Sequence, residues 1–131
     1  MSETSPCRVL VVDDDPLIIK ALGQALRDEG YVVETANGGQ AGIDVFQSAF
    51  ESGDPFSAVI TDLGMSVVDG SQVATTVKSA SPSTPVILLT GWGQWFETQP
   101  VPIPVDCVLA KPPKLAELRE ALARFLKPKS C

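Results

Sequence analysis

The segment Ala58-Val59-Ile60-Thr61-Asp62-Leu63-Gly64 begins with a short apolar run and reaches a carboxylate at Asp62. It contains two β-branched aliphatic residues, and the turn-forming pair Asp54-Pro55 precedes it. These features predict a buried strand that stops at Asp62. Ligands of open parallel α/β sheets bind beyond the carboxyl ends of the strands, so Asp62 is a candidate site residue. Because an aspartate also begins turns for local reasons, the rest of the chain has to decide between the two roles.

The chain contains four further short apolar runs. They are separated by stretches in which apolar residues recur at helical spacing. Such spacing is found in the ranges 17–26, 41–49, 73–77 and 115–125, and residues 92–99 allow one more short helix. Strands that alternate with helices predict an α/β fold with a parallel sheet covered on both faces. The predicted strands are residues 8–12, 31–35, 58–62, 85–90 and 106–110.

The boundaries of the domain and of its first helix can also be predicted. Asp15 is a candidate N-cap for that helix, Pro16 suits its first position, and Gly30 suits its C-terminal stop. No repeat or internal linker interrupts the chain. We therefore expect a single domain at 8–126, with a disordered lead at 1–7 and a short tail at 127–131.

Composition excludes several classes of function. The chain has 131 residues, of which 44% are hydrophobic and 20% charged, and its net charge is −6. This charge argues against nucleic-acid binding, which needs Lys and Arg against phosphates, and against docking on anionic membranes. There is no apolar run of ~20 residues and no secretion signal at the N-terminus. Three scattered cysteines indicate a reduced, cytoplasmic protein, and the absence of histidine excludes His-based triads.

Residues able to bind a metal and a phosphoryl group stand where the predicted strands end. Asp13 and Asp14 follow the first strand, and Asp62, Thr90 and Lys111 end or follow the third, fourth and fifth. Parallel strands end at one edge of the sheet, so these side chains converge. Two carboxylates at ~4 Å repel by about 4 kcal/mol at an effective dielectric of ~20, so a cation is expected among them. Oxygen ligands favour Mg²⁺, while the ammonium and the hydroxyl suit phosphoryl oxygens.

Four motifs, in this order and spacing, resemble the receiver domain of two-component response regulators over about residues 7–126. The resemblance implies a flavodoxin-like doubly wound fold of five βα units, with strand order 2-1-3-4-5 and a shortened or irregular fourth helix. The motifs are Val11-Val12-Asp13-Asp14-Asp15-Pro16, Thr61-Asp62-Leu63-Gly64-Met65 with Asp69-Gly70, Leu88-Leu89-Thr90-Gly91, and Leu109-Ala110-Lys111-Pro112.

The same resemblance implies a role for each site residue. Asp62 would accept a phosphoryl group from a histidine kinase or a phosphotransfer protein. Asp14, Asp62 and the main-chain carbonyl of Gly64 would bind Mg²⁺, with Asp13 acting mainly through water. Thr90 would sense the acyl phosphate, and Lys111 would pair with it. The peptide bond from Lys111 to Pro112 would be cis. Such a domain is a signalling module that switches a contact with a downstream protein, not an enzyme, and it binds neither nucleic acid nor membrane.

Three features depart from the pattern of the family. Ser66 and Val68 replace the usual Pro and Met, and Val108 replaces the usual aromatic switch residue. Prolines at 100, 102 and 104 prevent a helix from continuing through the segment 91–104. We expect this segment to be an irregular, partly mobile loop that phosphorylation orders, with Trp92 and Trp95 as reporters.

Two alternatives remain open at the level of the sequence. Asp13-x-Asp15 after a strand resembles the nucleophile motif of haloacid-dehalogenase phosphatases, although Leu17 stands where that motif has Thr or Val. A phosphorylation-independent interaction module would also keep the fold. No output segment follows Leu126, so the chain is expected to act by protein contact or to be a receiver from a hybrid sensor kinase.

Overall fold

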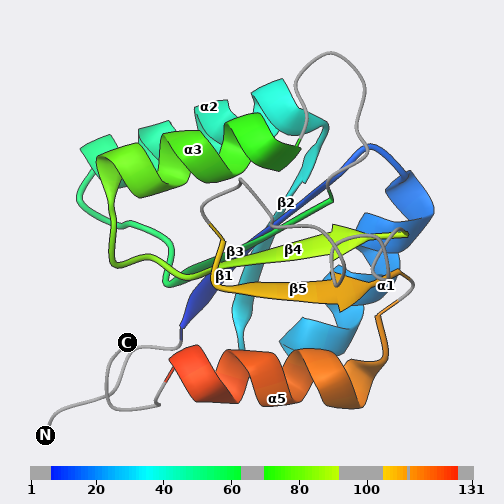
Figure 1. Ribbon diagram of the computed structural model, residues 1–131. Coiled ribbons are helices and arrows are strands. Elements are labelled where there is room, and N and C mark those ends of the chain that lie inside the picture. Colours follow the sequence, from blue (N-terminus) through cyan, green and yellow to red (C-terminus); the bar gives the residue numbers. More distant parts are fainter. Residues whose placement is uncertain (1–6, 63–69, 92–104, 112, 127–131) are drawn as a thin grey trace, which may run out of the picture.

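The computed structural model describes residues 7–62, 70–91, 105–111 and 113–126. Within them, five parallel strands form one sheet of order β2-β1-β3-β4-β5, and four helices pack on it (Figure 1). The strands are β1 (Arg8–Asp13), β2 (Val32–Asn37), β3 (Ala58–Asp62), β4 (Val86–Thr90) and β5 (Cys107–Ala110). The helices are α1 (Pro16–Asp28), α2 (Gly39–Glu51), α3 (Gly70–Ala80) and α5 (Leu115–Phe125).

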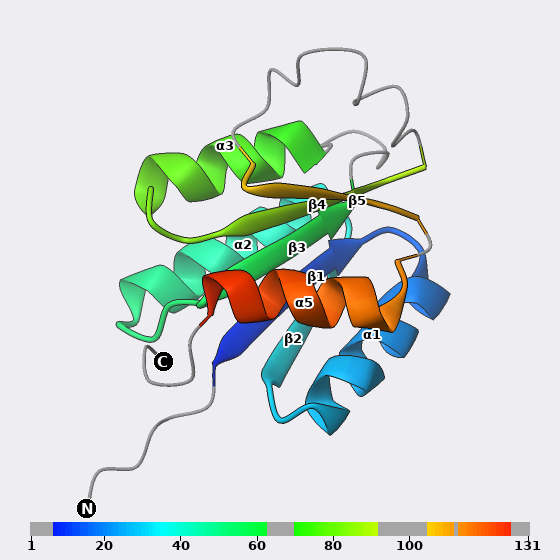
Figure 2. The same cartoon turned by 60° about the horizontal axis from the view of Figure 1, so that its bottom comes forward.

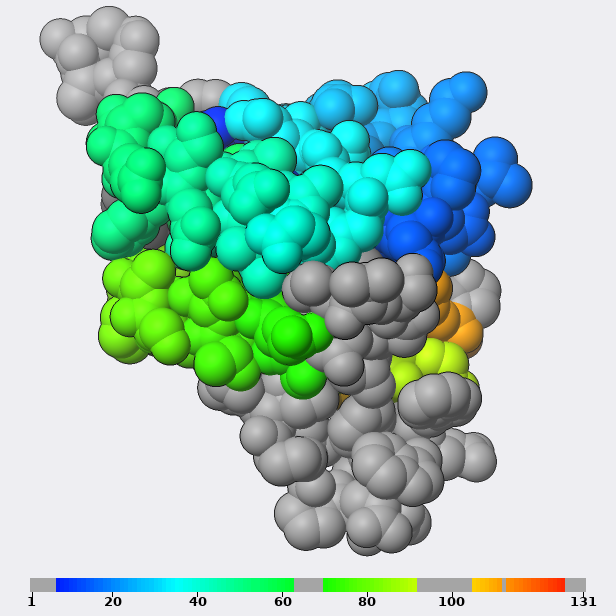
Figure 3. All heavy atoms as spheres, turned by 90° about the horizontal axis from the view of Figure 1, so that it is seen from above, coloured from blue at the N-terminus to red at the C-terminus, as the bar shows by residue number. Residues whose placement is uncertain are grey.

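The helices divide between the two faces of the sheet, because the apolar strands have alternating side chains to bury on both. α1 and α5 cover one face, and α2 and α3 lie side by side on the other (Figures 2 and 3). Every residue of β3 and β4 is buried, as the continuous apolar runs predict. The edge strand β5 differs, since three of its four residues are only half-buried and the fourth is exposed.

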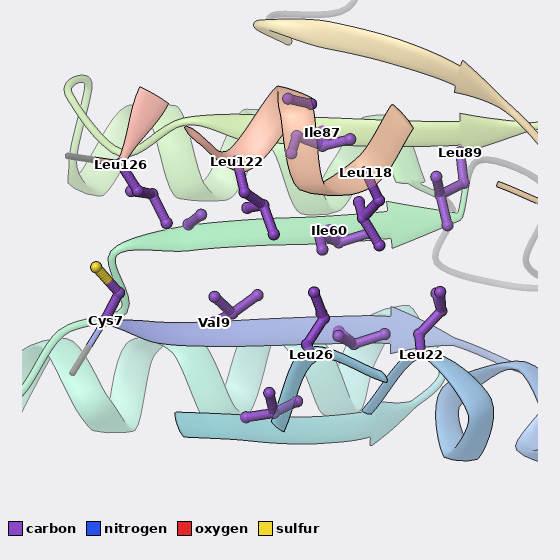
Figure 4. Close-up of a cluster of buried hydrophobic side chains, with 14 residues drawn as sticks. Cys7, Val9, Leu22, Leu26, Ile60, Ile87, Leu89, Leu118, Leu122 and Leu126 are labelled. Carbon is purple, nitrogen blue, oxygen red and sulfur yellow. The ribbon is translucent and has the colours of Figure 1, made fainter. Parts of the chain in front are cut away.

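Each face has its own apolar core. On the first, Leu118 and Leu122 of α5 pack with Ile60 of β3 and Val9 of β1 (Figure 4). The second core is built around Phe46 of α2, with side chains from α3 and from the alternate positions of β1 and β3. The two cores fix the strands from both sides, so the carboxyl ends of the strands are held in constant relative positions.

α2 approaches the sheet very closely at one glycine. A Cβ atom at Gly42 would lie 2.7 and 2.8 Å from the two γ-methyl groups of Val12. Because real Cβ atoms do not come this close, only glycine allows α2 to pack on β1 at this distance. Val12 immediately precedes Asp13, so this contact also fixes the end of β1.

The start of β5 is tied to β4 and α3 by one partly buried polar cluster. Asp106 Oδ2 accepts the N–H of Val86 at 2.8 Å and lies 2.6 Å from Lys78 Nζ. The same ammonium donates to the carbonyl of Thr84 at 2.8 Å. The first residues of β5 are therefore held by side chains as well as by the sheet ladder.

The α/β fold class and the strand order 2-1-3-4-5 are confirmed. The first helix begins as predicted, with Pro16 at its start and the Asp15 side chain accepting the N–H of Leu17 at 2.9 Å. Gly30 follows it with a φ of 100°, a conformation that favours glycine.

Several boundaries differ from the prediction. β2 continues to Asn37, two residues past the predicted end. Leu115 of the predicted apolar stripe is exposed. Cys7, which was assigned to the disordered lead, is buried in the first core because its carbonyl pairs with the N–H of Val32. Cys107 is a free thiol as expected, but Cys7 is disulfide-bonded.

Beyond Gly91, the irregular segment predicted at 91–104 lies outside the described residues, as do Ser66, Val68, Trp92 and Trp95. The loop and its two reporters therefore remain predictions. Among the described residues, no helix is both long enough and apolar enough to cross a bilayer.

Candidate functional site

Three carboxylates meet at the carboxyl edge of the sheet, on two neighbouring strands. Asp13 is the last residue of β1 and Asp62 the last of β3, and these strands pair directly. Asp14 follows Asp13. One oxygen from each of the three carboxylates lies within 4.8 Å of the others. Asp13 and Asp62 are buried whereas Asp14 is exposed, so the cluster opens to solvent on the side of Asp14.

The ammonium of Lys111 lies between the two buried carboxylates. Its Nζ is 3.1 Å from Asp13 Oδ2 and 3.2 Å from Asp62 Oδ2. The backbone of Lys111 is fixed at the end of β5, because its N–H donates to the carbonyl of Thr90 at 2.9 Å. Thr90, the buried last residue of β4, thus connects the strand next to Asp62 with the lysine. Asp13, Asp14, Asp62 and Lys111 therefore lie together at this edge of the sheet, and Thr90 is linked to Lys111 through its main-chain carbonyl.

Burial opposes the charge on Asp13. Its side chain is inaccessible to solvent, and this desolvation raises the pKa of the carboxyl above its ordinary value of 3.8, with a further upward contribution from Asp62. The backbone hydrogen bond from Asp15 and the contact with Lys111 lower the pKa again, but only in part. For Lys111, burial lowers the pKa, yet the two carboxylates outweigh it and the net shift is upward.

The two oxygens of Asp13 have different surroundings. Oδ1 accepts the N–H of Asp15 at 2.9 Å. Oδ2 is fully buried and has no hydrogen-bond partner among the described residues, so its contact with Lys111 is an ion pair without hydrogen-bond alignment. A buried carboxylate oxygen that accepts no hydrogen bond costs free energy. A metal ion bound at the site would remove that cost.

The donor set fits a small divalent cation. Three carboxylates and one ammonium leave two negative charges when all are ionised. Carboxylate oxygens are the ligands that Mg²⁺ prefers, and Mg²⁺ sites in proteins use one or two carboxylates together with phosphate oxygens. The fourth predicted ligand, the carbonyl of Gly64, and the predicted cis Pro112 lie outside the described residues.

The structure speaks against the phosphatase alternative. That mechanism needs the Asp13 and Asp15 carboxylates to face the substrate together. Asp15 instead uses its carboxylate to cap α1, and Asp13 points its oxygens at the N–H of Asp15 and at Lys111. Sequence reasoning assigned Asp15 the cap of the first helix and, in the phosphatase alternative, a place in the nucleophile motif. The hydrogen bond from its main chain to Asp13 carries no signal in the sequence, because every non-proline residue has an N–H.

Comparison with known proteins identifies the family. The family model described as the response regulator receiver domain matches residues 9–123. The transcriptional regulatory protein GlrR of Escherichia coli is 40% identical over 88 residues, which are 67% of this chain and 19% of GlrR. The response regulator MprA of Mycolicibacterium vanbaalenii is 32% identical over 123 residues, 93% of this chain and 51% of MprA. The chain therefore spans about half or less of these curated relatives.

Solved structures agree with this result. The response regulator TrrA from Thermotoga maritima, in complex with Mg²⁺ and BeF, superposes with a TM-score of 0.77 at 30% identity. The match covers 92% of this chain and 99% of TrrA. The chemotaxis protein CheY4 of Vibrio cholerae gives a TM-score of 0.76 at 29% identity, over 93% of this chain and 100% of CheY4.

Proposed function

The chain belongs to the response regulator receiver domain family, and we propose that it accepts a phosphoryl group on Asp62. Receiver domains are the signalling modules of two-component phosphorelays, in which they interact with histidine kinases and with downstream effectors. The family therefore gives the type of reaction. The residue, the cation and the partners of this chain are inferred from the site.

One observation carries the assignment of Asp62. Its carboxylate ends the central strand β3 beside a second buried carboxylate, and one lysine ammonium lies within 3.2 Å of both. Asp62 retains 5% exposure where Asp13 has none, so a reactive phosphorus can reach Asp62 more readily. A nucleophile needs this combination of access and nearby positive charge.

The reaction follows from these positions. An oxygen of Asp62 attacks the phosphorus of the donor, a new P–O bond forms, and the bond from phosphorus to the donor breaks. The product is an acyl phosphate on Asp62. Lys111 would compensate charge on the phosphoryl oxygens. Thr90, a buried residue whose main-chain carbonyl accepts the N–H of Lys111, is proposed to report the modification. Positioning and charge compensation supply most of the catalysis in phosphoryl transfer.

Mg²⁺ completes the proposed site. We assign its ligands to Asp13, Asp14, Asp62 and the main-chain carbonyl of Gly64, with Asp13 acting mainly through water. Mg²⁺ would neutralise charge on the phosphoryl oxygens. The TrrA structure, which holds Mg²⁺ and BeF, supports this assignment by analogy. The donor is proposed to be a histidine kinase or a phosphotransfer protein of the cytoplasm, and the output a contact between the domain at 8–126 and another protein.

The test is phosphorylation by acetyl phosphate with Mg²⁺, followed by mass analysis of the intact protein and of its peptides. Wild type should gain one phosphoryl group, carried by the peptide that contains Asp62. Asp62→Asn should gain none, and the control Asp44→Asn, on the exposed surface of α2, should match wild type. Undiminished label on Asp62→Asn would move the acceptor elsewhere. A folded wild type that takes up no label would favour the interaction module.

A further inference from the structure

Asp15 joins the carboxylate cluster to the first turn of α1. Its N–H donates to Asp13 Oδ1 at 2.9 Å, and its own Oδ1 accepts the N–H of Leu17 at 2.9 Å. Its carbonyl accepts the N–H groups of Ile18 and Ile19 at 3.1 and 3.2 Å. One residue therefore serves at the same time as the cap of a helix and as a hydrogen-bond donor to the site.

The main-chain N–H of Asp15 determines which oxygen of Asp13 faces Lys111 and the proposed Mg²⁺ site. Because Oδ1 is occupied by the N–H of Asp15, Oδ2 is the oxygen directed toward Lys111. Oδ2 is also the buried oxygen without a hydrogen-bond partner among residues 7–62, 70–91, 105–111 and 113–126. If the N–H of Asp15 moved, the carboxylate of Asp13 could turn and offer its oxygens differently.

The side chain of Asp15 keeps that N–H in place. Residue 15 is extended, with φ −97° and ψ 109°, and the cap bond to Leu17 closes the turn in this conformation. Loss of an N-cap oxygen costs ~1 kcal/mol and loosens the first turn of a helix. Pro16 restricts residue 15 to extended conformations in any variant, so α1 should still form without the cap.

We propose that Asp15 is a positioning residue for the cation site: through the cap of α1 it holds its own N–H on Asp13, and so aims Asp13 Oδ2 at the cation. The proposal rests on the proposed function only in placing a divalent cation at this cluster. It requires a cap oxygen at position 15, not a negative charge.

Four substitutions separate the cap from the charge. Asp15→Asn and Asp15→Ser keep a good cap oxygen and lose the charge, whereas Asp15→Glu keeps the charge but is one methylene too long to cap as aspartate does. Asp15→Ala loses both. The measurement is the Mg²⁺ dissociation constant of the metal-stripped protein, from calorimetry and from the rise in unfolding midpoint with Mg²⁺. Leu122→Val, in the core under α5, is the control for a general loss of stability.

Loss of the cap should weaken Mg²⁺ binding by about threefold to tenfold in the Ala and Glu variants, since tenfold corresponds to ~1.4 kcal/mol. Asn and Ser should stay within about twofold of each other and bind more tightly than Ala and Glu. Leu122→Val should bind like wild type. Affinities that follow charge alone, or equal affinities for Ala, Asn and Ser, would overturn the proposal. Failure of wild type to label Asp62 while this pattern holds would instead reject only the proposed function.

Discussion

Asp13 holds its carboxylate where ionisation is unfavourable, and this has a consequence for stability. Burial raises its pKa in the folded protein above the value of 3.8 expected in the unfolded chain. The folded state therefore binds the proton more tightly than the unfolded state does. The contribution of Asp13 to the free energy of unfolding falls as the pH rises from about 3.8 through the raised pKa, and stays low at neutral pH.

We predict that Asp13→Asn is more stable than wild type at pH 7 in the presence of a chelator, because the amide carries no charge to desolvate. The advantage should shrink as the pH falls through the raised pKa of Asp13 toward the unfolded value of about 3.8, and it should be lost below that value. Urea unfolding of both proteins across this pH range measures the difference between their free energies of unfolding. The contributions of the other titrating groups cancel in that difference. A difference that does not change with pH would show that burial of the charge is not the cause.

Lys111 occupies the position between two carboxylates that a metal ion also needs. We predict that Lys111→Ala binds Mg²⁺ more tightly than wild type, by roughly tenfold, since a positive charge is removed about 3 Å from the ligand oxygens. The same variant should bind beryllofluoride more weakly, because the cation that faces the phosphoryl oxygens is lost. Calorimetric titration with Mg²⁺ and with beryllofluoride measures the two dissociation constants.

Lys114→Ala is the matched control for this pair of measurements, because Lys114 is exposed and its side chain makes no cap bond to α5. It should change neither affinity. Beryllofluoride binding by Lys111→Ala as tight as that of wild type would return Lys111 to the role of a surface lysine.

At the scale of the elements, the close approach of α2 to β1 depends on the absence of a side chain at Gly42. Replacing Gly42 by alanine would place a methyl group 2.7 Å from Val12, and overpacking of this kind costs about 1 to 3 kcal/mol. The gain in helix propensity offsets at most ~1 kcal/mol. We predict that Gly42→Ala lowers the free energy of unfolding and shifts α2 away from β1, which urea unfolding and the amide spectrum of α2 would detect.

Gly23, in the middle of α1, provides the comparison. A Cβ there would meet nothing closer than 3.4 Å, and that contact is the flexible end of Arg27. Gly23→Ala should therefore be neutral or stabilising by up to ~1 kcal/mol. Equal effects of the two substitutions would mean that the sheet accommodates the extra methyl group at Gly42.

The elements were predictable to the extent that periodicity determines them. The buried runs of β1, β3 and β4 and the cap of α1 have local signals, and the structure places them within about one residue of prediction. β2 was predicted too short because Ala36 and Asn37 have no strand propensity, and pairing with β1 extends it. Burial of Cys7 likewise depends on pairing with the neighbouring strand, which a local pattern does not contain.

On the scale of the whole molecule, the site joins residues nearly one hundred positions apart, and the topology alone makes this predictable. Once the strands are parallel, their last residues share an edge, and Asp13, Asp62, Thr90 and Lys111 each end or follow a strand. The sequence could not reveal which oxygen of Asp13 accepts no hydrogen bond or that Lys111 contacts both carboxylates. Such details depend on side-chain orientation within the assembled edge. Gly64 and residues 92–104 lie outside the described part of the chain.

The uneven burial of the sheet also predicts how amide hydrogens exchange with solvent. β3 is central and buried throughout, whereas β5 is an edge strand whose start is clamped by Asp106 and whose last residue is exposed. Local opening should therefore begin at the end of β5, and the Lys111 amide should exchange through a lower-energy opening than the Ile60 amide. Lys111 would then leave the carboxylates many times before the domain unfolds once. The negative charge of the site would be intermittently uncovered, and each such interval would admit a cation without any global rearrangement.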